Sequence, residues 1–428
     1  MKVLVLGQGG REHALVHALS QSSLVTEIHV IPGSDGMMSQ ALCHKLDWKS
    51  TEALIDFCLK TEIEYVVIGP EDPLVAGLAD RLRERGILCV GPSQEGAKLE
   101  GSKIFAKEFM TQAKIPTAKY EVVSYVEETL KKCEHFTPPY VFKADGLAAG
   151  KGVYICKDKE DLERSAREVF EKKILGDAGR RAILEQFSPG WELSYLILTN
   201  GNDFQTLPLA QDHKRLCDHD EGPNTGGMGT IAPLKISQNL RDDIDQKIVR
   251  PTLDNLKKNG ILYRGVIFFG LMITEQGPSL LEYNCRFGDP ETQVILPLVD
   301  GDWGQILKDL AAGILKPIQT KNMAATCVVM AAPGYPYSPQ KGVKIEGDLQ
   351  FSSPSGYFLH AGTAKADANN WVTNGGRVLC SMGIGPTLEE AQKAAYVQAS
   401  KVTWNRIQMR KDIGAKMIKP NPTKTNAN

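Results

Sequence analysis

The sequence has no C-x-x-C pair, no excess of charge of either sign and no hydrophobic run long enough to cross a membrane. Its nine cysteines are scattered and odd in number, a pattern typical of reduced thiols in a cytosolic protein. The formal net charge of -1 gives no overall attraction to nucleic acid or anionic membranes. The first apolar stretch reaches Gly7 and Arg11 too soon for a signal peptide. We therefore expect a cytoplasmic protein without nucleic-acid or membrane partners.

The first hundred residues show the alternation of a parallel α/β domain. Strand patterns at 2–6, 27–31, 65–68 and 87–90 alternate with helix patterns at 11–21, 51–60 and 75–85. A loop at 69–73 follows a strand, where open α/β sheets bind ligands, and it contains Glu71 and Asp72. We predict an α/β substrate-binding domain over residues 1–101.

The 428 residues are too many for one ordinary core, and further units are expected. Residues 102–325 are predicted as a central domain, in which 119–190 form a strand-rich subdomain around a glycine-rich turn. In that subdomain Leu162, Ala166, Val169 and Phe170 recur with the spacing of an amphipathic helix. A further helix is predicted at 247–259. Residues 326–418 are predicted as a small α+β domain, whose helix begins at the capping-box pattern Thr387–Glu390. The polar tail 419–428 is expected to be disordered.

Two oxygen-bearing side chains lie two residues apart at the end of a predicted strand. Residues i and i+2 of a strand face the same side, so Glu282 and Asn284 would present their oxygens together. Such ligands suit a Mg²⁺ ion that bridges nucleotide phosphates and keeps much of its water. For an isolated E-x-N, a solvated strand end remains the alternative.

Two glycine-rich segments are candidates for phosphate binding. The turn at 7–12 joins a strand to a helix, where backbone N–H groups hold anions. It lacks the third glycine of a dinucleotide fingerprint, because Glu12 stands there, so a Rossmann dehydrogenase is disfavoured. A tight turn without ligand stays possible. The second segment, 143–153, lies between strand patterns and does not match a P-loop; a flexible turn with solvated lysines is its alternative.

A long polar connection follows the predicted strand at 205–210. It contains the segments QDHKR (211–215) and GPNTGGMG (222–229). Loops this long inside a compact domain are usually functional or disordered. A metal site from His213, Cys217 and His219 is disfavoured, since the spacing fits no zinc pattern.

These segments, together with RFGDPETQ (286–293), resemble the phosphoribosylamine–glycine ligases, the glycinamide ribonucleotide synthetases of purine biosynthesis within the ATP-grasp superfamily. The resemblance covers nearly the whole chain, as far as the segment TNGGRV (373–378) near its end. It implies a central ATP-grasp domain with a mobile glycine-rich flap. It also implies ATP, Mg²⁺ or Mn²⁺ as cofactors, and glycine and 5-phosphoribosylamine as substrates, for a monomer or small homo-oligomer.

The resemblance also assigns residues. Metal ligands would be Glu282 and Asn284. The ATP-binding residues would be Lys103, Lys143, Asp145, Gly146, Gly150, Lys151, Gly152, Glu185, Phe187 and Glu192. Among these, Glu185 and Phe187 belong to the segment 183–187, which resembles the hinge strand that meets the adenine, largely through its backbone. The substrate-binding residues would be Gly9, Gly10, Arg11, Glu71, Asp72, Asn224, Thr225, Gly226, Gly227 and Asp289. Catalytic roles fall to Arg286, Asp212 and Lys214.

Some features leave alternatives open. Arg286 faces developing charge or substrate, but a structural salt bridge with Asp289 or Glu291 is the competing interpretation. Cys217 and His219 stand where the family more often has glycine. An ATP-grasp carboxylase with another acceptor, or a non-catalytic nucleotide-binding protein, would share the ATP-binding half. The segments 212–229 and 286–293 are what distinguish a glycine ligase from these.

Overall fold

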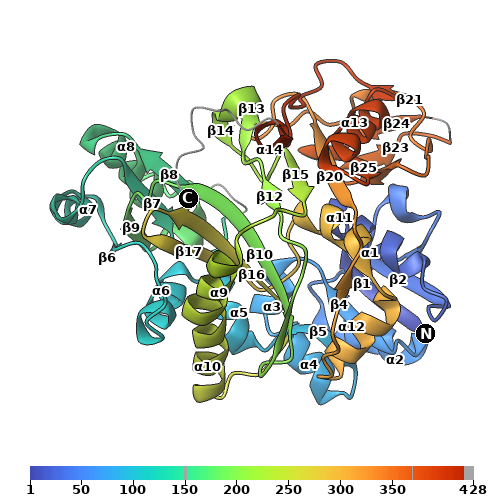
Figure 1. Cartoon of the computed structure of the whole chain (residues 1–428), viewed down its shortest axis with the longest axis horizontal. Helices are drawn as coiled ribbons and strands as arrows, with labels where there is room; N and C mark the ends of the chain where they lie inside the picture. Colours follow the sequence, from blue (N-terminus) through green and yellow to red (C-terminus); the bar gives the residue numbers. More distant parts are fainter. Residues whose placement is uncertain (149–151, 369, 419–428) are drawn as a thin grey trace.

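A computed structural model describes residues 1–148, 152–368 and 370–418. The N-terminal unit, blue in Figure 1, is a parallel sheet in the order β5-β4-β1-β2-β3 with helices on its faces. Its strands are β1 (Lys2–Gly7), β2 (Glu27–Pro32), β3 (Leu42–Cys43), β4 (Tyr65–Ile68) and β5 (Leu88–Pro92), and its helices are α1 (Gly10–Ser20), α2 (Thr51–Thr61), α3 (Glu71–Val75) and α4 (Leu78–Glu84). The Val, Leu and Ile side chains of β1 and β4 are buried, as expected for a parallel sheet that is covered on both faces.

The central unit continues the same sheet with antiparallel strands. β5 pairs with β16 through Tyr263↔Pro92, and β16 pairs with β10 and β17. The strands are β10 (Trp191–Thr199), β11 (Phe204–Thr206), β16 (Tyr263–Thr274) and β17 (Gly277–Asn284), and the helices are α5 (Gln94–Gly101), α6 (Lys103–Gln112), α9 (Gln238–Ile244), a π-helical turn (Asp245–Val249) and α10 (Arg250–Lys258). Residues far apart in sequence thereby share one sheet.

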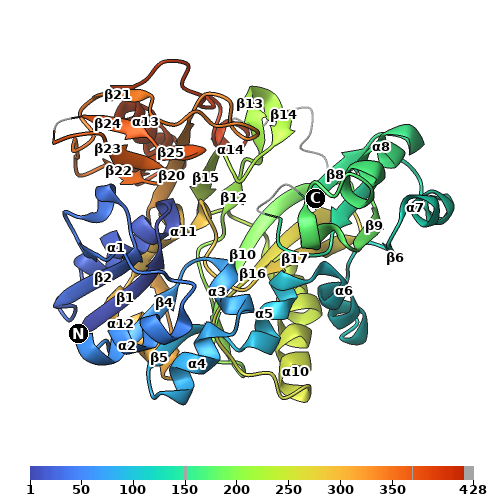
Figure 2. The same ribbon diagram turned by 180° about the vertical axis from the view of Figure 1, so that it is seen from behind.

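A four-stranded antiparallel sheet in the order β6-β9-β7-β8 forms a separate flap subdomain, which projects to one side in both Figures 1 and 2. It comprises β6 (Tyr120–Val123), β7 (Tyr140–Ala144), β8 (Val153–Cys156), β9 (Ala182–Gln186), α7 (Val126–Lys132) and α8 (Lys159–Phe170). Helix α8 begins at Asp158, whose carboxylate accepts from the Asp161 N–H, and it buries Leu162, Ala166 and Val169. The flap therefore has its own small core.

The C-terminal unit is built on a sheet of order β12-β15-β20-β25-β22, covered by α13. Two of its strands come from the central segment, so the polar connection reaches into this sheet. Its main elements are β12 (Gln211–Asp212), β15 (Gly229–Ala232), β20 (Ala324–Ala331), β22 (Gly356–His360), β25 (Arg377–Gly385) and α13 (Leu388–Ala399). A second small sheet holds β21 (Lys344–Gly347), β23 (Thr363–Lys365), β24 (Trp371–Thr373) and β26 (Val402–Thr403), and α14 (Ala415–Ile418) follows.

Shorter elements connect these units. The hairpin of β13 (Arg215–Cys217) and β14 (Glu221–Asn224) projects from the polar connection. Helix α11 (Glu291–Ile295) packs on α1, and α12 (Trp303–Ala311) packs on β5; between and after them run β18 (Val299–Asp300) and β19 (Gln319–Thr320).

The α/β class and the three-part arrangement agree with the sequence prediction, including the capping box at Thr387. Several boundaries were wrong. The predicted helix 75–85 is interrupted, because Gly77 adopts φ +82° between α3 and α4. The predicted loop at 69–73 is already helical from Glu71, and the predicted strand 205–210 is regular only in β11. The predicted helix 247–259 begins as a π-helical turn and continues as α10.

Candidate active site

The two predicted metal ligands lie on one face of β17, as strand alternation requires. Glu282 is exposed and Asn284 half-buried, whereas Tyr283 between them is buried on the other face. Across the described residues, neither ligand side chain has a hydrogen-bond or ion-pair partner, so both oxygens are free to bind a cation. The described chain contains no group of three or more His, Cys, Asp or Glu side chains placed to hold a metal by itself. Two oxygens alone suit a Mg²⁺ that takes its other ligands from phosphates and water.

The two predicted phosphate-binding lysines lie near these ligands. Burial lowers the pKa of Lys103, and Glu282 opposes that shift. Burial would also lower the pKa of Lys143, but Glu185 and Glu282 raise it above its usual value. Both ammonium groups therefore lie close enough to Glu282 to interact with it, and such a group of charges suits the binding of nucleotide phosphates.

The Glu185 side chain does something the hinge prediction did not include. Its carboxylate is only 3% exposed and lies 2.6 Å from Lys143 Nζ and 2.5 Å from Lys107 Nζ. Burial would raise the pKa of Glu185, but these two lysines hold it below its usual value. Lys107 also donates to Thr117 Oγ1 at 2.6 Å, and that hydroxyl donates to the Leu280 carbonyl. Glu185 thus fixes a lysine rather than presenting its carboxylate to an adenine.

A cleft of about 1060 Å³ lies between the flap and the central sheet, and most of the predicted site residues line it. It is lined by Arg11, Glu71, Lys103, Lys143, Gly152, Glu185, Phe187, Glu192, Asp212, Lys214, Asn224, Thr225, Gly226, Glu282, Asn284, Arg286 and Asp289. The predicted metal ligands, the two lysines, the predicted hinge and the polar connection 211–229 therefore line one continuous space.

At the acceptor end of this cleft, Asp212 and Lys214 form an ion pair of 2.6 Å. Asp212 Oδ1 also accepts from the His213 N–H at 2.7 Å and from Thr230 Oγ1 at 3.4 Å. Gly227 has φ +111°, and a Cβ there would lie 2.6 Å from Asp212 Oδ1. Glycine is thus required at 227 both for its backbone conformation and for the close approach of this carboxylate.

The alternative partners predicted for Arg286 were wrong. Its guanidinium lies 2.8 Å from Glu100 and 3.4 Å from Glu71, and the neighbouring Cys285 N–H donates to Glu100 at 2.7 Å. The strand ends at Asn284, so the chain turns toward α5 and α3 instead of continuing past the metal ligands. Arg286 still lines the cleft.

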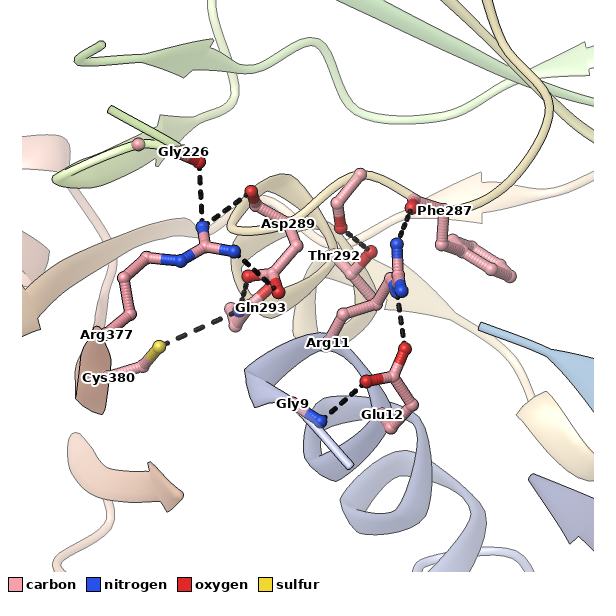
Figure 3. A network of polar contacts seen from close by, with 12 residues as sticks. Gly9, Arg11, Glu12, Gly226, Phe287, Asp289, Thr292, Gln293, Arg377 and Cys380 are labelled. Atoms are coloured by element: carbon pink, nitrogen blue, oxygen red, sulfur yellow. Dashed lines mark hydrogen bonds and ion pairs between the residues drawn. The ribbon is translucent and has the colours of Figure 1, made fainter. Parts of the chain in front are cut away.

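Asp289 instead pairs with Arg377 of the C-terminal unit (Figure 3). Arg377 lies 3.0 Å from the Asp289 carboxylate and donates to the carbonyls of Asp289 and Gly226, each at 2.8 Å. Gln293 donates to Asp289 at 2.8 Å. Asp289 and Arg377 line both the large cleft and a second cavity of about 390 Å³. This ion pair therefore separates the two spaces.

The second cavity is formed by the turn before α1 and by the C-terminal unit. Gly9 and Gly10 line it together with Gln8, Asp35 and Gly375. Glu12 fixes the turn, because it accepts from the Gly9 N–H at 2.7 Å and from Arg11 Nε at 2.6 Å (Figure 3). Arg11 also donates to the Phe287 carbonyl at 3.2 Å, which joins this turn to RFGDPETQ. The residue that breaks the dinucleotide fingerprint is thus a structural part of the turn.

Some predicted site residues lie elsewhere. Among the described lining residues of the two cavities, Asp72, Asp145, Gly146 and Gly227 are absent. Asp145 caps α6 by accepting from Ser102 Oγ and the Ile104 N–H, and it pairs with Arg181. The Gly146 carbonyl accepts from Lys103 Nζ at 3.4 Å. The predicted sites at Gly150 and Lys151 lie outside the described residues.

Further residues act on these groups without having been assigned a binding or catalytic role from the sequence: Glu100, Lys107, Ser194, Glu291 and Arg377. The only local signal was that Glu291 and Arg377 lie within the quoted motifs. His219 adopts φ +61°, a left-handed conformation that glycine adopts more readily than other residues.

A flap sheet and a central antiparallel sheet enclosing a cleft with two lysines and a Glu/Asn pair define an ATP-grasp enzyme. The family models agree: the N domain of phosphoribosylglycinamide synthetase matches residues 1–100, its ATP-grasp (A) domain 101–292 and its C domain 325–416. The chain belongs to the phosphoribosylglycinamide synthetase family.

Individual relatives support this membership. The phosphoribosylamine–glycine ligase of Caldanaerobacter subterraneus is 41% identical, over 97% of this chain and 100% of that protein. The crystal structure of the Thermotoga maritima phosphoribosylamine–glycine ligase superposes with a TM-score of 0.84 at 38% identity, over 96% of this chain and 100% of that one. A biotin carboxylase domain from Hydrogenobacter thermophilus, at 18% identity and TM-score 0.75 (95% and 91% covered), shares the fold alone.

Within the described part of the chain, no helix is long and apolar enough to cross a membrane.

Proposed function

We propose that this protein joins glycine to 5-phosphoribosylamine, with conversion of ATP to ADP and phosphate and a glycyl phosphate intermediate. The observation that carries the proposal is that the segments 211–229 and 286–293 line the same cleft as Lys103, Lys143 and Glu282. These segments distinguish a glycine ligase from a carboxylase, whose ATP half would look the same.

Each part of the cleft has a task in this reaction. Glu282 and Asn284 hold Mg²⁺ or Mn²⁺, which neutralises phosphate charge when bound. Lys103 and Lys143 bind the phosphates, while Phe187, Glu192 and the β9 backbone bind adenosine. Phosphoryl transfer converts the poor leaving group of a carboxylate into phosphate, and it depends on alignment and charge neutralisation. Lys214 and Arg286 supply that positive charge beside the acyl group, and Asp212 holds Lys214 in place.

The phosphoribosyl group belongs in the second cavity. Gly9 and Gly10 offer backbone N–H groups at the start of α1, and Arg377 supplies a guanidinium there. The Asp289–Arg377 pair lies between this cavity and the cleft, where the amine must meet the glycyl phosphate. Nine free cysteines agree with a cytoplasmic enzyme. It acts as a monomer or small homo-oligomer.

The test is release of ADP from ATP and glycine, with and without freshly generated phosphoribosylamine. Rapid release only when all three are present, with glycinamide ribonucleotide as product, is expected. Equal release with bicarbonate in place of glycine would favour a carboxylase instead.

A further inference from the structure

Glu291 is a buried carboxylate at the acceptor end of the cleft, outside the roles assigned above. It is the first residue of α11, is 1% exposed and lines the cleft. Ser194 Oγ donates to its Oε1 at 3.0 Å. Burying a carboxylate costs free energy unless it is paired or hydrogen-bonded. Buried carboxylates with shifted pKa values are also frequent at functional sites.

Glycine makes the position of Glu291 possible. A Cβ at Gly288 would lie 2.4 Å from Glu291 Oε2, so a side chain there would displace this carboxylate. The charged groups that face Glu291 are Lys214 and Asp212 from the polar connection, and Arg286 from its own segment. Burial raises the pKa of Glu291; Asp212 adds to the rise, and Lys214 opposes it.

The sheet register places Glu291 relative to the metal ligands. Glu282 pairs with Gly270, and Gly270 pairs with Ser194, the residue that holds Glu291. Two interstrand spacings separate the backbones of Glu282 and Ser194, about 10 Å in all. Gly270 has no side chain to fill the space between them. An acyl phosphate whose phosphate faces Glu282 would therefore have its carbonyl directed toward Ser194 and Glu291.

Given the proposed function on which this rests, we propose that Glu291 is a catalytic residue that accepts the proton lost by the amine during amide formation. The amine lone pair attacks the glycyl carbonyl carbon and forms the C–N bond. The bond from that carbon to the phosphate oxygen breaks, and phosphate leaves with the electron pair. The N–H proton moves to Oε2 of Glu291, while Oε1 stays hydrogen-bonded to Ser194.

Asp212 is less suited to this task. Its oxygens are taken by Lys214, the His213 N–H and Thr230, whereas among the described side chains only Ser194 hydrogen-bonds to Glu291, at Oε1. A carboxylate whose pKa is raised by burial is also a stronger proton acceptor. Lys214 then favours the ionised form of Glu291, and Asp212 favours its protonated form.

The test compares Glu291→Gln with Glu275→Gln, an exposed control in the β16–β17 turn. Two acceptors are used: phosphoribosylamine, and hydroxylamine at high concentration, a nucleophile that needs little help from a base. We expect Glu291→Gln to lose about a hundredfold or more of ligation, within the range for a positioned base, while glycyl hydroxamate formation stays within threefold of wild type. Equal loss with both acceptors, or ligation within threefold of wild type, would overturn the proposal.

Ser194→Ala provides a second readout that keeps the carboxylate in place. Loss of a hydrogen bond to the charged form raises a carboxyl pKa. The acid limb of the kcat/KM profile for phosphoribosylamine should therefore move to higher pH, and an unmoved limb counts against Glu291 as the base. Failure of the wild-type protein to release ADP with glycine and phosphoribosylamine would instead reject the proposed function itself.

Discussion

Lys143 and Glu185 form a buried ion pair in which Nζ lies 2.6 Å from Oε2. Lys107 occupies the other carboxylate oxygen at 2.5 Å. Two lysines therefore share one carboxylate, and this group of three side chains keeps one net positive charge beside the space where the ATP phosphates are proposed to bind. Lys107 acts as a positioning residue, because it competes with Lys143 for Glu185.

We predict that Lys107→Met raises the KM for ATP about tenfold, with a smaller effect on kcat at saturating ATP. Without Lys107, Glu185 holds Lys143 more tightly, and Lys143 becomes less available to phosphate. Breaking a buried pair also lowers stability, by about 3–5 kcal/mol. Steady-state kinetics and thermal melting are the measurements, with exposed Lys114→Met as the matched control. Recovery of ATP binding in Lys107→Arg supports the charge argument; an unchanged KM for ATP in Lys107→Met contradicts it.

We predict that Glu282→Ala abolishes ligation, by at least about a hundredfold, because a charge-neutralising metal contributes several kcal/mol to the transition state. The fold should survive, because this carboxylate is exposed and surface changes cost within about 0.5 kcal/mol. Turnover across a Mg²⁺ titration and thermal melting test this, with Glu275→Ala as control. Near-normal turnover at saturating Mg²⁺ would show that the metal lies elsewhere.

Arg286→Lys is expected to lose roughly tenfold to a thousandfold of ligase activity, about 1.4–4 kcal/mol, and much less ATP affinity. Lysine cannot reproduce a guanidinium that reaches Glu100, Glu71 and the cleft together. The variant should therefore also melt at a lower temperature than wild type. A lower melting temperature combined with wild-type turnover would leave Arg286 a purely structural role.

The interface between α1 and β22 should weaken in acid. His13 Nδ1 accepts from the buried His360 N–H at 2.8 Å. Burial lowers the pKa of His360 to about 4 and, with His360 and His17 adding to the shift, that of His13 to about 3. The unfolded chain then binds more protons than the folded one between about pH 6.5 and pH 4, so stability falls as pH falls through that window. For His360 alone the loss reaches about 3 kcal/mol.

The measurement is the change in melting temperature between pH 7.5 and pH 5. His360→Gln should reduce this pH dependence, because glutamine does not titrate, whereas His135→Gln, at an exposed site, should leave it unchanged. Equal slopes in wild type and His360→Gln would exclude this histidine as the source.

Features fixed by local pattern were predictable from the sequence. Alternation placed Glu282 and Asn284 on one face of β17, and the spacing of Leu162, Ala166 and Val169 predicted α8. The turn before α1 and the strand–helix alternation of residues 1–101 also follow from local backbone preferences. Errors arose where a single glycine or a local irregularity changed the path of the chain, as at Gly77 and in the π-helical turn at 245–249.

Long-range partners were decided by the tertiary structure. The competing interpretation of Arg286 named ion-pair partners nearby in sequence, Asp289 or Glu291, but Arg286 meets Glu100, because the chain turns after Asn284 against α5. Glu185 meets Lys143 on the neighbouring strand of the flap and Lys107 from α6 of the central unit, and Arg377 meets Asp289 across units. No local pattern connects these partners. The sequence by itself determined which motifs the chain carries and which chemistry they suit. Only packing of distant segments decided which charges neutralise one another, because ion pairing depends on distance and burial rather than on separation along the chain.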